Sequence, residues 1–256
     1  MSEPLQLAPR GRRVLVTGAA GGIGRAVVQA LAACECSVGA ADVTPAVSDV
    51  PGASASAVFD VRDRRACEQA VTSLAQELGG LDAVVANAGV VDTIHRAERF
   101  SEEDWRRDIE TNLSGQFHVV RAAFEALAAS DDGRIVLISS ASAEHGLPGQ
   151  VAYTAAKAGV VGMARTLAAE WGPRGVHCNV VMPGLIDTPK TQALPEAMRS
   201  AFAATIPLQR IGDVRELAGV VTFLLSPAAA YVNGAVIRVD GGFGLSTGGL
   251  MVGGTK

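Results

Sequence analysis

The chain has 256 residues, of which 48% are hydrophobic and 19% charged, and it carries a net charge of −4 and four scattered cysteines. This length and composition suit one globular unit with a sizeable core, so we expect a single domain over residues 1–256. The acidic balance argues against a nucleic-acid partner, and no apolar run is long enough for a signal peptide or a membrane span, so we expect a soluble, cytoplasmic protein.

Seven short runs rich in aliphatic residues alternate with helix-forming stretches along the chain. The predicted strands are 13–16, 37–41, 55–59, 83–86, 134–139, 176–181 and 235–239. This alternation predicts an α/β fold, a Rossmann-like, doubly wound parallel sheet of about seven strands flanked by helices. Because right-handed crossovers bring the carboxyl ends of parallel strands to one edge, we expect ligands at that edge.

A glycine-rich turn joins the first predicted strand to a predicted helix over 25–33. Residues 17–24 have the sequence TGAAGGIG, in which Gly18, Gly22 and Gly24 follow the spacing Gly-x-x-x-Gly-x-Gly. Glycines let the backbone turn tightly and approach a pyrophosphate, and the amides at a helix amino terminus receive its charge. The spacing differs from Gly-x-Gly-x-x-Gly, so the turn alone indicates a dinucleotide site without specifying its kind.

Asp42 follows the second predicted strand, eighteen positions after Gly24 (42 − 24 = 18). A carboxylate at this place accepts hydrogen bonds from the adenosine ribose hydroxyls and repels a 2′-phosphate. No basic residue occupies 19–21 or position 43 to bind such a phosphate. We therefore expect NAD as the cofactor in preference to NADP; the alternative is that Asp42 only caps the turn before Pro45.

A long helix is expected from about residue 102 to about residue 128, with an interruption at Gly115. It begins after a capping-box variant at 101–104, and a second such signature at 213–216 predicts a later helix. Asn112 lies inside the long helix. A polar residue near a kink either serves the active site or satisfies carbonyl groups that the kink sets free.

Tyr153 and Lys157 lie four residues apart in a helix-forming stretch, 151–171, and Tyr153 comes thirteen residues after Ser140 (153 − 140 = 13). One helical turn places both side chains on the same face. A fixed cation stabilises a phenolate that otherwise forms only near pH 10, so the pair predicts an acid–base catalyst. For an isolated Tyr-x-x-x-Lys the alternative is an ordinary surface pair, and Ser139 competes with Ser140 as the nearby serine.

Two later segments lack regular patterning. Residues 190–210 carry a weak helix around 195–204 and are the candidate substrate lid. Residues 244–256 are rich in glycine, so they form either a frayed tail or an ordered arm that reaches a neighbouring subunit.

Taken together, these motifs resemble the short-chain dehydrogenase/reductase family, in which the Thr-Gly-x-x-x-Gly-x-Gly turn and the Ser, Tyr-x-x-x-Lys set recur at similar separations. The resemblance covers nearly the whole chain. Further pieces occur in the order typical of the family: Asp60-Val61, Asn87-Ala88-Gly89, Asn112, Pro183-Gly184 and Asp240-Gly241-Gly242.

The resemblance implies a catalytic set of Ser140, Tyr153, Lys157 and Asn112. Tyr153 is then the general acid or base, and Lys157 holds the nicotinamide ribose and lowers the pKa of the tyrosine. Ser140 hydrogen-bonds the substrate oxygen, and Asn112 anchors a water that connects Lys157 to solvent. The implied cofactor-binding residues are Gly18, Gly22, Ile23, Gly24, Asp42, Asp60, Val61, Asn87, Gly89, Tyr153, Lys157, Pro183, Gly184, Ile186 and Thr188. Family members often associate through the helices that match 102–128 and 151–171, so a homo-oligomer, a tetramer by resemblance, is expected.

Some polar residues fall outside this set. Glu144 and His145 lie in the loop between Ser140 and Tyr153, so His145 is either a surface histidine or a substrate contact. The histidines and cysteines lack the spacing of metal ligands, and no hydrolytic triad is evident, so no metal site is expected.

The sequence therefore predicts an NAD(H)-dependent oxidoreductase that transfers a hydride between nicotinamide and a secondary alcohol or ketone. One alternative is an NADPH-dependent reductase of 3-oxoacyl thioesters, and a remote one is a non-catalytic nucleotide-sensing protein. The substrate is expected to be a modest hydrophobic alcohol or carbonyl compound, because residues 141–150 and 191–211 are mostly small or apolar. Arg199 and Arg210 would alter this expectation if they pointed inward.

Overall fold

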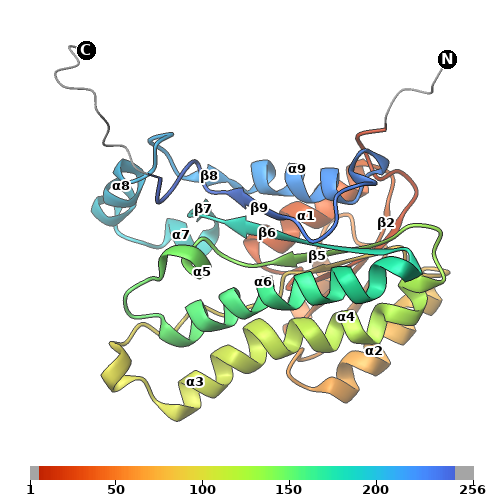
Figure 1. The fold of residues 1–256 in the computed structure, drawn as a ribbon, viewed down its shortest axis with the longest axis horizontal. Coiled ribbons are helices and arrows are strands. Elements are labelled where there is room, and N and C mark those ends of the chain that lie inside the picture. The colour runs from red at the N-terminus through yellow and green to blue at the C-terminus, as the bar shows by residue number, and fades with distance from the viewer. Residues whose placement is uncertain (1–5, 246–256) are drawn as a thin grey trace.

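The computed structural model describes residues 6–245, so most of the glycine-rich segment, 246–256, lies outside the described residues. Seven parallel strands form one sheet in the order β3-β2-β1-β4-β5-β6-β9 (Figure 1). The strands are β1 Arg13–Thr17, β2 Ser37–Asp42, β3 Ala55–Val58, β4 Ala83–Ala86, β5 Gly133–Ile138, β6 Val176–Pro183 and β9 Val236–Val239. The predicted doubly wound sheet is confirmed, and each strand agrees with its predicted range to within two residues.

The strands are apolar because helices cover the sheet on both faces. Strands β4 and β5 are buried along their whole length, whereas the edge strand β9 is half-buried throughout. The chain order reverses between β1 and β4, which pair with each other in the middle of the sheet. This reversal is the topological switch point at which α/β sheets bind ligands, outside the carboxyl ends of the strands.

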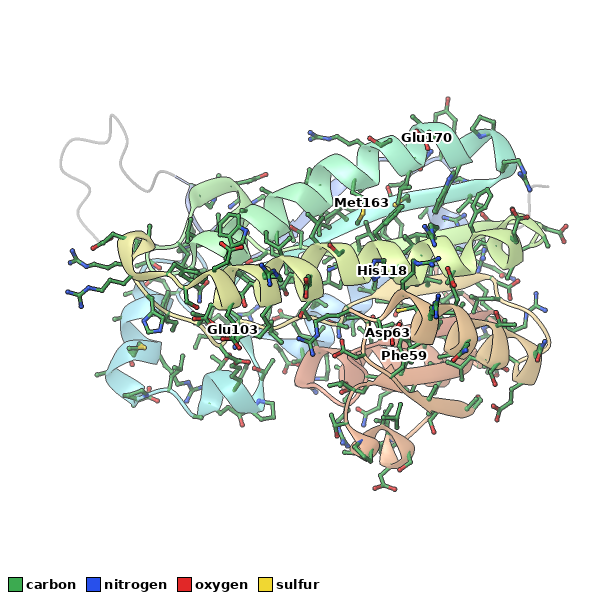
Figure 2. The ribbon with its side chains drawn as sticks, turned by 90° about the horizontal axis from the view of Figure 1, so that it is seen from below. Phe59, Asp63, Glu103, His118, Met163 and Glu170 are labelled. Carbon is green, nitrogen blue, oxygen red and sulfur yellow. The ribbon has the colours of Figure 1, made fainter. Side chains whose placement is uncertain are left out.

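The helices form two layers. One layer contains α1 (Gly22–Ala33) and α9 (Val214–Leu224), and the other contains α2 (Arg64–Glu77), α4 (Gly115–Ala128) and α6 (Val151–Trp171). Figure 2 shows the second layer from below, with Met163 and Glu170 on α6 and His118 on α4. An imidazole nitrogen of His118 lies 3.0 Å from the Val61 carbonyl oxygen, which ties α4 to the segment after β3.

Several short elements gather at the carboxyl edge of the sheet, on the left in Figure 1. They are α5 (Ser142–His145), α7 (Pro189–Gln192), α8 (Glu196–Ala204) and a two-stranded parallel sheet of β7 (Ile186–Asp187) and β8 (Gly212–Asp213). The candidate lid, 190–210, therefore contains most of α7, all of α8 and the turn that follows. Within residues 6–245 no helix is long and apolar enough to cross a membrane.

The long helix differs from its prediction at one point. Helix α3 (Glu102–Ile109) passes into α4 through a π-helical turn, Glu110–Ser114, and Gly115 has helical backbone angles. The predicted interruption at Gly115 is therefore wrong. Gly115 is needed for close packing instead, since a Cβ atom there would lie 2.6 Å from Val61 Cγ2. The wider turn contains Asn112.

A charged cluster lies at the opposite, amino edge of the sheet. Arg134, at the start of β5, is 1% exposed; it donates to both oxygens of Asp132 and, at 3.2 Å, to the Leu224 carbonyl at the end of α9. Arg12 also pairs with Asp132. Burying a guanidinium costs free energy unless its donors find partners, and here they do. The cluster therefore fastens α9 to the sheet.

Replacing Arg134 with leucine should lower the free energy of unfolding by about 3 kcal/mol, because Asp132 and the Leu224 carbonyl lose their buried partner. Urea denaturation measures the change. Arg64→Leu is the matched control: Arg64 is half-exposed and, among residues 6–245, pairs with Glu68 alone, on its own helix, so its loss should cost less than about 0.5 kcal/mol. Equal costs for the two variants would contradict the role of the cluster.

Candidate active site

The glycine turn between β1 and α1 has the shape that a pyrophosphate requires. Gly18 has a φ of +63°, which an L side chain rarely adopts, and a Cβ there would also lie 2.8 Å from Asn87 Nδ2. Helix α1 begins at Gly22, and its N-cap, Gly21, has no side chain to cap the first amides. Those amides, with the positive end of the helix dipole, form an anion site. The residues present therefore fit the diphosphate of a dinucleotide.

Asp42 lies beside this turn, at the end of β2. Its Oδ2 accepts a hydrogen bond from the Ala20 amide at 3.0 Å, and its Oδ1 accepts one from the Thr44 amide at 3.1 Å. The contact with Thr44 is the turn cap that the sequence left as an alternative. The contact with Ala20 holds the carboxylate against the glycine turn, where an adenosine ribose would lie.

Asp60 and Val61 follow β3 at the same edge. The Phe59 amide donates to the Asp42 carbonyl at 2.9 Å, so this segment lies next to Asp42. The guanidinium of Arg62 binds the Asp60 carboxylate through two nitrogens and lowers the pKa of Asp60. The Asp60 carboxylate is therefore bound by both the backbone amide and the side chain of Arg62.

The loop after β4 is fixed between the glycine turn and the long helix. Asn87 Nδ2 donates to the Thr17 carbonyl at 2.9 Å, and the hydroxyl of Thr17 accepts the Asn87 and Ala88 amides. Thr17 is 1% exposed. Sequence reasoning missed its role, although its place directly before Gly18 was a signal. At Gly89, a Cβ would lie 2.6 Å from Asn112 Oδ1 and 3.4 Å from Lys157 Nζ.

Asn112 uses its side chain on the backbone. Its Nδ2 donates to the carbonyls of Val90 and Asp108, and its Oδ1 accepts the Val90 amide at 3.0 Å. These bonds match the structural alternative, in which a polar residue near a kink satisfies free backbone groups. They also fasten the π-helical turn to the loop after β4. Lys157 lies close to that loop.

Ser139 and Ser140 have different surroundings. Ser139 is 2% exposed and its hydroxyl donates to the Lys157 carbonyl at 2.7 Å, so it joins β5 to α6. Ser140 lies close enough to Tyr153 to lower the pKa of the phenol, and its Oγ accepts from Ser142 Oγ at 3.0 Å. This geometry agrees with the choice of Ser140 as the serine that faces the tyrosine. Ser142 had no signal in the sequence.

Tyr153 and Lys157 do face each other, with Lys157 Nζ 5.7 Å from the centre of the phenol ring. Lys157 is 3% exposed and donates to the Ile138 carbonyl at 2.9 Å; burial lowers its pKa to about 7. The pKa of Tyr153 is raised, chiefly by burial and further by the charge of Asp108. Burial outweighs the opposing contact with Ser140, and the lowering of the Tyr153 pKa by Lys157 stays a prediction.

Asp108 is a third residue whose role the sequence did not reveal. It is fully buried one helical turn before Asn112, and burial raises its pKa. Its Oδ1 lies 3.5 Å from Arg107 Nη2. The signal would have been an acidic residue four positions from a predicted site residue in a helix, which places it on the same face.

The segment after β6 completes the site. The Gly184 amide donates to the Val239 carbonyl, and Ile186 pairs with Gly212. Thr188 caps α7 and lies against the glycine turn, since a Cβ on Gly22 would be 2.9 Å from Thr188 Cβ. The structure thus brings together the predicted site residues of β1, β4, β5, α6 and the β6–α7 segment at one edge.

Arg199 and Arg210, two of the three basic residues of the lid, are held by carboxylates. Arg199 pairs with Asp187 and Glu196, and Arg210 makes two bonds to Glu216, at 2.6 and 2.7 Å. Among residues 6–245 no three histidine, cysteine or acidic side chains gather as a metal site would require.

Comparison with known proteins agrees with this geometry. A family model described as Enoyl-(Acyl carrier protein) reductase matches residues 18–244. The 3-oxoacyl-[acyl-carrier-protein] reductase MabA of Mycobacterium tuberculosis is 41% identical over 234 residues, which cover 91% of this chain and 93% of that protein. FabG of Escherichia coli, which has the same described activity, is 39% identical over 237 residues, covering 91% and 97%.

Solved structures show the same fold. The crystal structure of gox2181 has a TM-score of 0.87 and 35% identity, and the match covers 93% of this chain and 97% of that one. A protein of Sinorhizobium meliloti 1021, provisionally described as a short-chain alcohol dehydrogenase, has a TM-score of 0.85 and 34% identity over 91% of this chain and 96% of that one. With its glycine turn, Ser140, Tyr153 and Lys157 at one sheet edge, the chain belongs to the short-chain dehydrogenase/reductase family of oxidoreductases.

Proposed function

We propose that this protein reduces the 3-oxo group of an acyl thioester, with a nicotinamide dinucleotide bound along the glycine turn. The observation that carries the proposal is the placement of the Tyr153 phenol beside Ser140 and Lys157 at the carboxyl edge of the sheet, where it can give a proton to a carbonyl oxygen. Reduction of a ketone needs a proton donor, whereas oxidation of an alcohol needs the phenolate. The described activity of the MabA and FabG relatives supports the same substrate class, and so favours the thioester alternative over the simple alcohol dehydrogenase.

The residues have distinct tasks in this reaction. When bound, the reduced cofactor supplies the hydride that makes the oxo carbon tetrahedral and leaves negative charge on its oxygen. Ser140 donates a hydrogen bond to that oxygen, and Tyr153 transfers its phenolic proton to it. Lys157 binds the ribose hydroxyls beside Tyr153, and Asn112 supports a water through which a proton returns to the tyrosine.

The cofactor proposed is NADH. The Asp42 carboxylate is held against the glycine turn by the Ala20 amide, so a 2′-phosphate would meet a negative charge there. No basic side chain stands at 19–21 or 43 to offset the repulsion. The remaining dinucleotide contacts are assigned to Gly18, Gly22, Ile23 and Gly24 for the diphosphate; Asp60, Val61, Asn87 and Gly89 for the adenosine side; and Pro183, Gly184, Ile186 and Thr188 for the nicotinamide end.

A second candidate function is oxidation of a secondary alcohol with NAD. Asp42 supports this function as well, and the Sinorhizobium protein of similar structure is provisionally described as a short-chain alcohol dehydrogenase. A non-catalytic sensor is disfavoured because Ser140, Tyr153 and Lys157 are all present and adjacent. Initial rates with 3-oxoacyl thioesters, simple ketones and secondary alcohols, each with both cofactors, separate the three functions.

We also propose a homotetramer. Strand β9 is an edge strand of the sheet, and Phe117 on α4 and Val151 on α6 are more than one-third exposed. Apolar side chains and an unpaired strand edge of this kind are commonly covered by another copy of the chain.

Replacing Tyr153 with phenylalanine should lower kcat by a factor of about 10²–10⁴, because the proton donor is lost. Cofactor affinity, followed by nicotinamide fluorescence, should remain nearly the same. Tyr231→Phe is the matched control, since Tyr231 is the only other tyrosine and is fully exposed. Full turnover by the Tyr153 variant would exclude the assignment.

Replacing Asp42 with asparagine should raise the ratio of kcat/KM with NADPH to that with NADH by about tenfold or more, because one repulsive charge is removed while the side-chain shape is kept. Asp49→Ala, an exposed acidic residue of the following turn, should leave the ratio unchanged. A wild-type enzyme that prefers NADPH would refute the role given to Asp42.

Cofactor affinity should fall as pH rises above 7. The pKa of Lys157 is about 7 in the free protein, and hydrogen bonds to the ribose hydroxyls favour the ammonium form, so binding takes up a proton above that pH. The Kd for NADH should therefore be constant below pH 7 and rise by up to about tenfold per pH unit above it. Isothermal titration in two buffers of different ionisation enthalpy measures the proton uptake. Lys157→Met should bind weakly without this dependence; a pH-independent wild type would contradict the prediction.

A further inference from the structure

The turn that follows β9 lies between two segments of the substrate side. On one side the Leu208 amide, just after α8, donates to the Gly241 carbonyl at 3.2 Å. On the other side the ring of Phe243 meets His145 of α5 edge-on, with ring centres 5.7 Å apart. We call residues 240–244 the terminal turn. It touches both the end of the candidate lid and the helix after Ser140.

One guanidinium holds these parts together. Arg238, from β9, donates to Glu144 Oε2 at 3.0 Å, to Asp240 Oδ2 at 2.7 Å and to the Phe243 carbonyl. Asp240 is 5% exposed on its side chain, and its Oδ1 accepts the Gly242 amide at 2.9 Å. Arg238 therefore fixes the terminal turn through Asp240 and Phe243, and fixes α5 through Glu144.

Helix α5 is connected directly to the catalytic serine. The Ser142 amide and hydroxyl both donate to Ser140 Oγ, at 3.2 and 3.0 Å. Glu144 and His145 follow within the same short helix, which ends at Gly146 with a φ of +69°. A helix of four residues has little stability of its own. Its position therefore depends on contacts such as the Glu144–Arg238 bond.

We propose that Arg238 is a positioning residue that sets substrate selection. By holding the terminal turn against α5, it places His145 and Phe243 as a fixed rim beside Ser140, and this rim limits which groups attached to the carbonyl carbon reach Tyr153. The inference rests on the proposed reductase function for the nature of the substrate, but not for the existence of the rim.

The chemistry of the cluster explains why arginine stands at position 238. A planar guanidinium binds a carboxylate, a second carboxylate and a carbonyl at fixed angles, whereas a lysine ammonium is a single point charge. The glycine at 244 has its own reason: it has a φ of +78°, and a side chain there would overlap the ring of His145. Gly244→Ala thus displaces the rim while keeping the side chains of Arg238, Glu144 and Asp240.

The test compares three rim variants with a control. Arg238→Lys keeps the charge but loses the fork; Glu144→Gln removes only the α5 contact; Gly244→Ala displaces His145. Arg215→Lys is the control, because Arg215 is 85% exposed on its side chain and binds an aspartate two residues away, Asp213, as Arg238 binds Asp240, without joining another segment. Each protein is assayed with acetoacetyl and 3-oxododecanoyl thioesters, and NADH affinity is measured separately.

For each rim variant we expect the ratio of the KM values for the long and the short substrate to change by about fivefold or more, with kcat changed less than threefold and NADH affinity unchanged. Arg215→Lys should leave that ratio as in the wild type. An equal loss of kcat/KM on both substrates, or unchanged kinetics in all three variants, would overturn the inference.

A failure of the proposed function is distinguishable from a failure of the rim. If the wild type ignores thioesters but acts on simple ketones, the same variants are assayed with 2-butanone and 2-dodecanone. A changed size preference there supports the rim while refuting the thioester substrate. An unchanged preference overturns the rim.

Discussion

Two hydrogen bonds run in opposite directions between the end of β5 and the first turns of α6: Lys157 Nζ donates to the Ile138 carbonyl, and Ser139 Oγ donates to the Lys157 carbonyl. All of these atoms are buried, where such bonds are strong and costly to break. They fix the register between strand and helix. Ser140 and Tyr153 lie next to these two hydrogen bonds. Their relative position therefore does not depend on the ordering of a flexible loop.

The other side of the site depends on a local exception to helix geometry. The π-helical turn at 110–114 contains Asn112, whose side chain donates to the helical Asp108 carbonyl and to the Val90 carbonyl of the loop after β4, and accepts the Val90 amide. Insertions of this type often mark functional positions because they change the direction of side chains within a helix. Here the turn places Asn112 against Gly89, which also lies close to Lys157. The loop after β4 is thus held by side chains from the glycine turn and from the long helix at once.

Much of this arrangement could be predicted from the sequence because it depends on periodicity and on spacing along the chain. The seven strands, helix α6 and the capping box of Asp213 and Glu216 are local features. Gly115 was misjudged because a glycine required for packing looks the same in a sequence as one that ends a helix. The raised pKa of Tyr153 could not be foreseen, since it depends on burial by segments distant in the chain. The Arg238–Glu144 contact, between residues 94 positions apart, has no local signature either.

Strand β5 carries the Arg134 cluster at its beginning and leads to Ser140 at its end. Six residues of extended chain separate these two places by about 20 Å. Substitutions so far apart usually have additive effects on stability. Substitutions at the amino edge can therefore change the stability of the protein without altering its chemistry. Added stability there would offset destabilising substitutions in the lid and in α5 that change the substrate. The two ends of one strand give this enzyme separate places for adaptation, one to temperature and the other to new substrates.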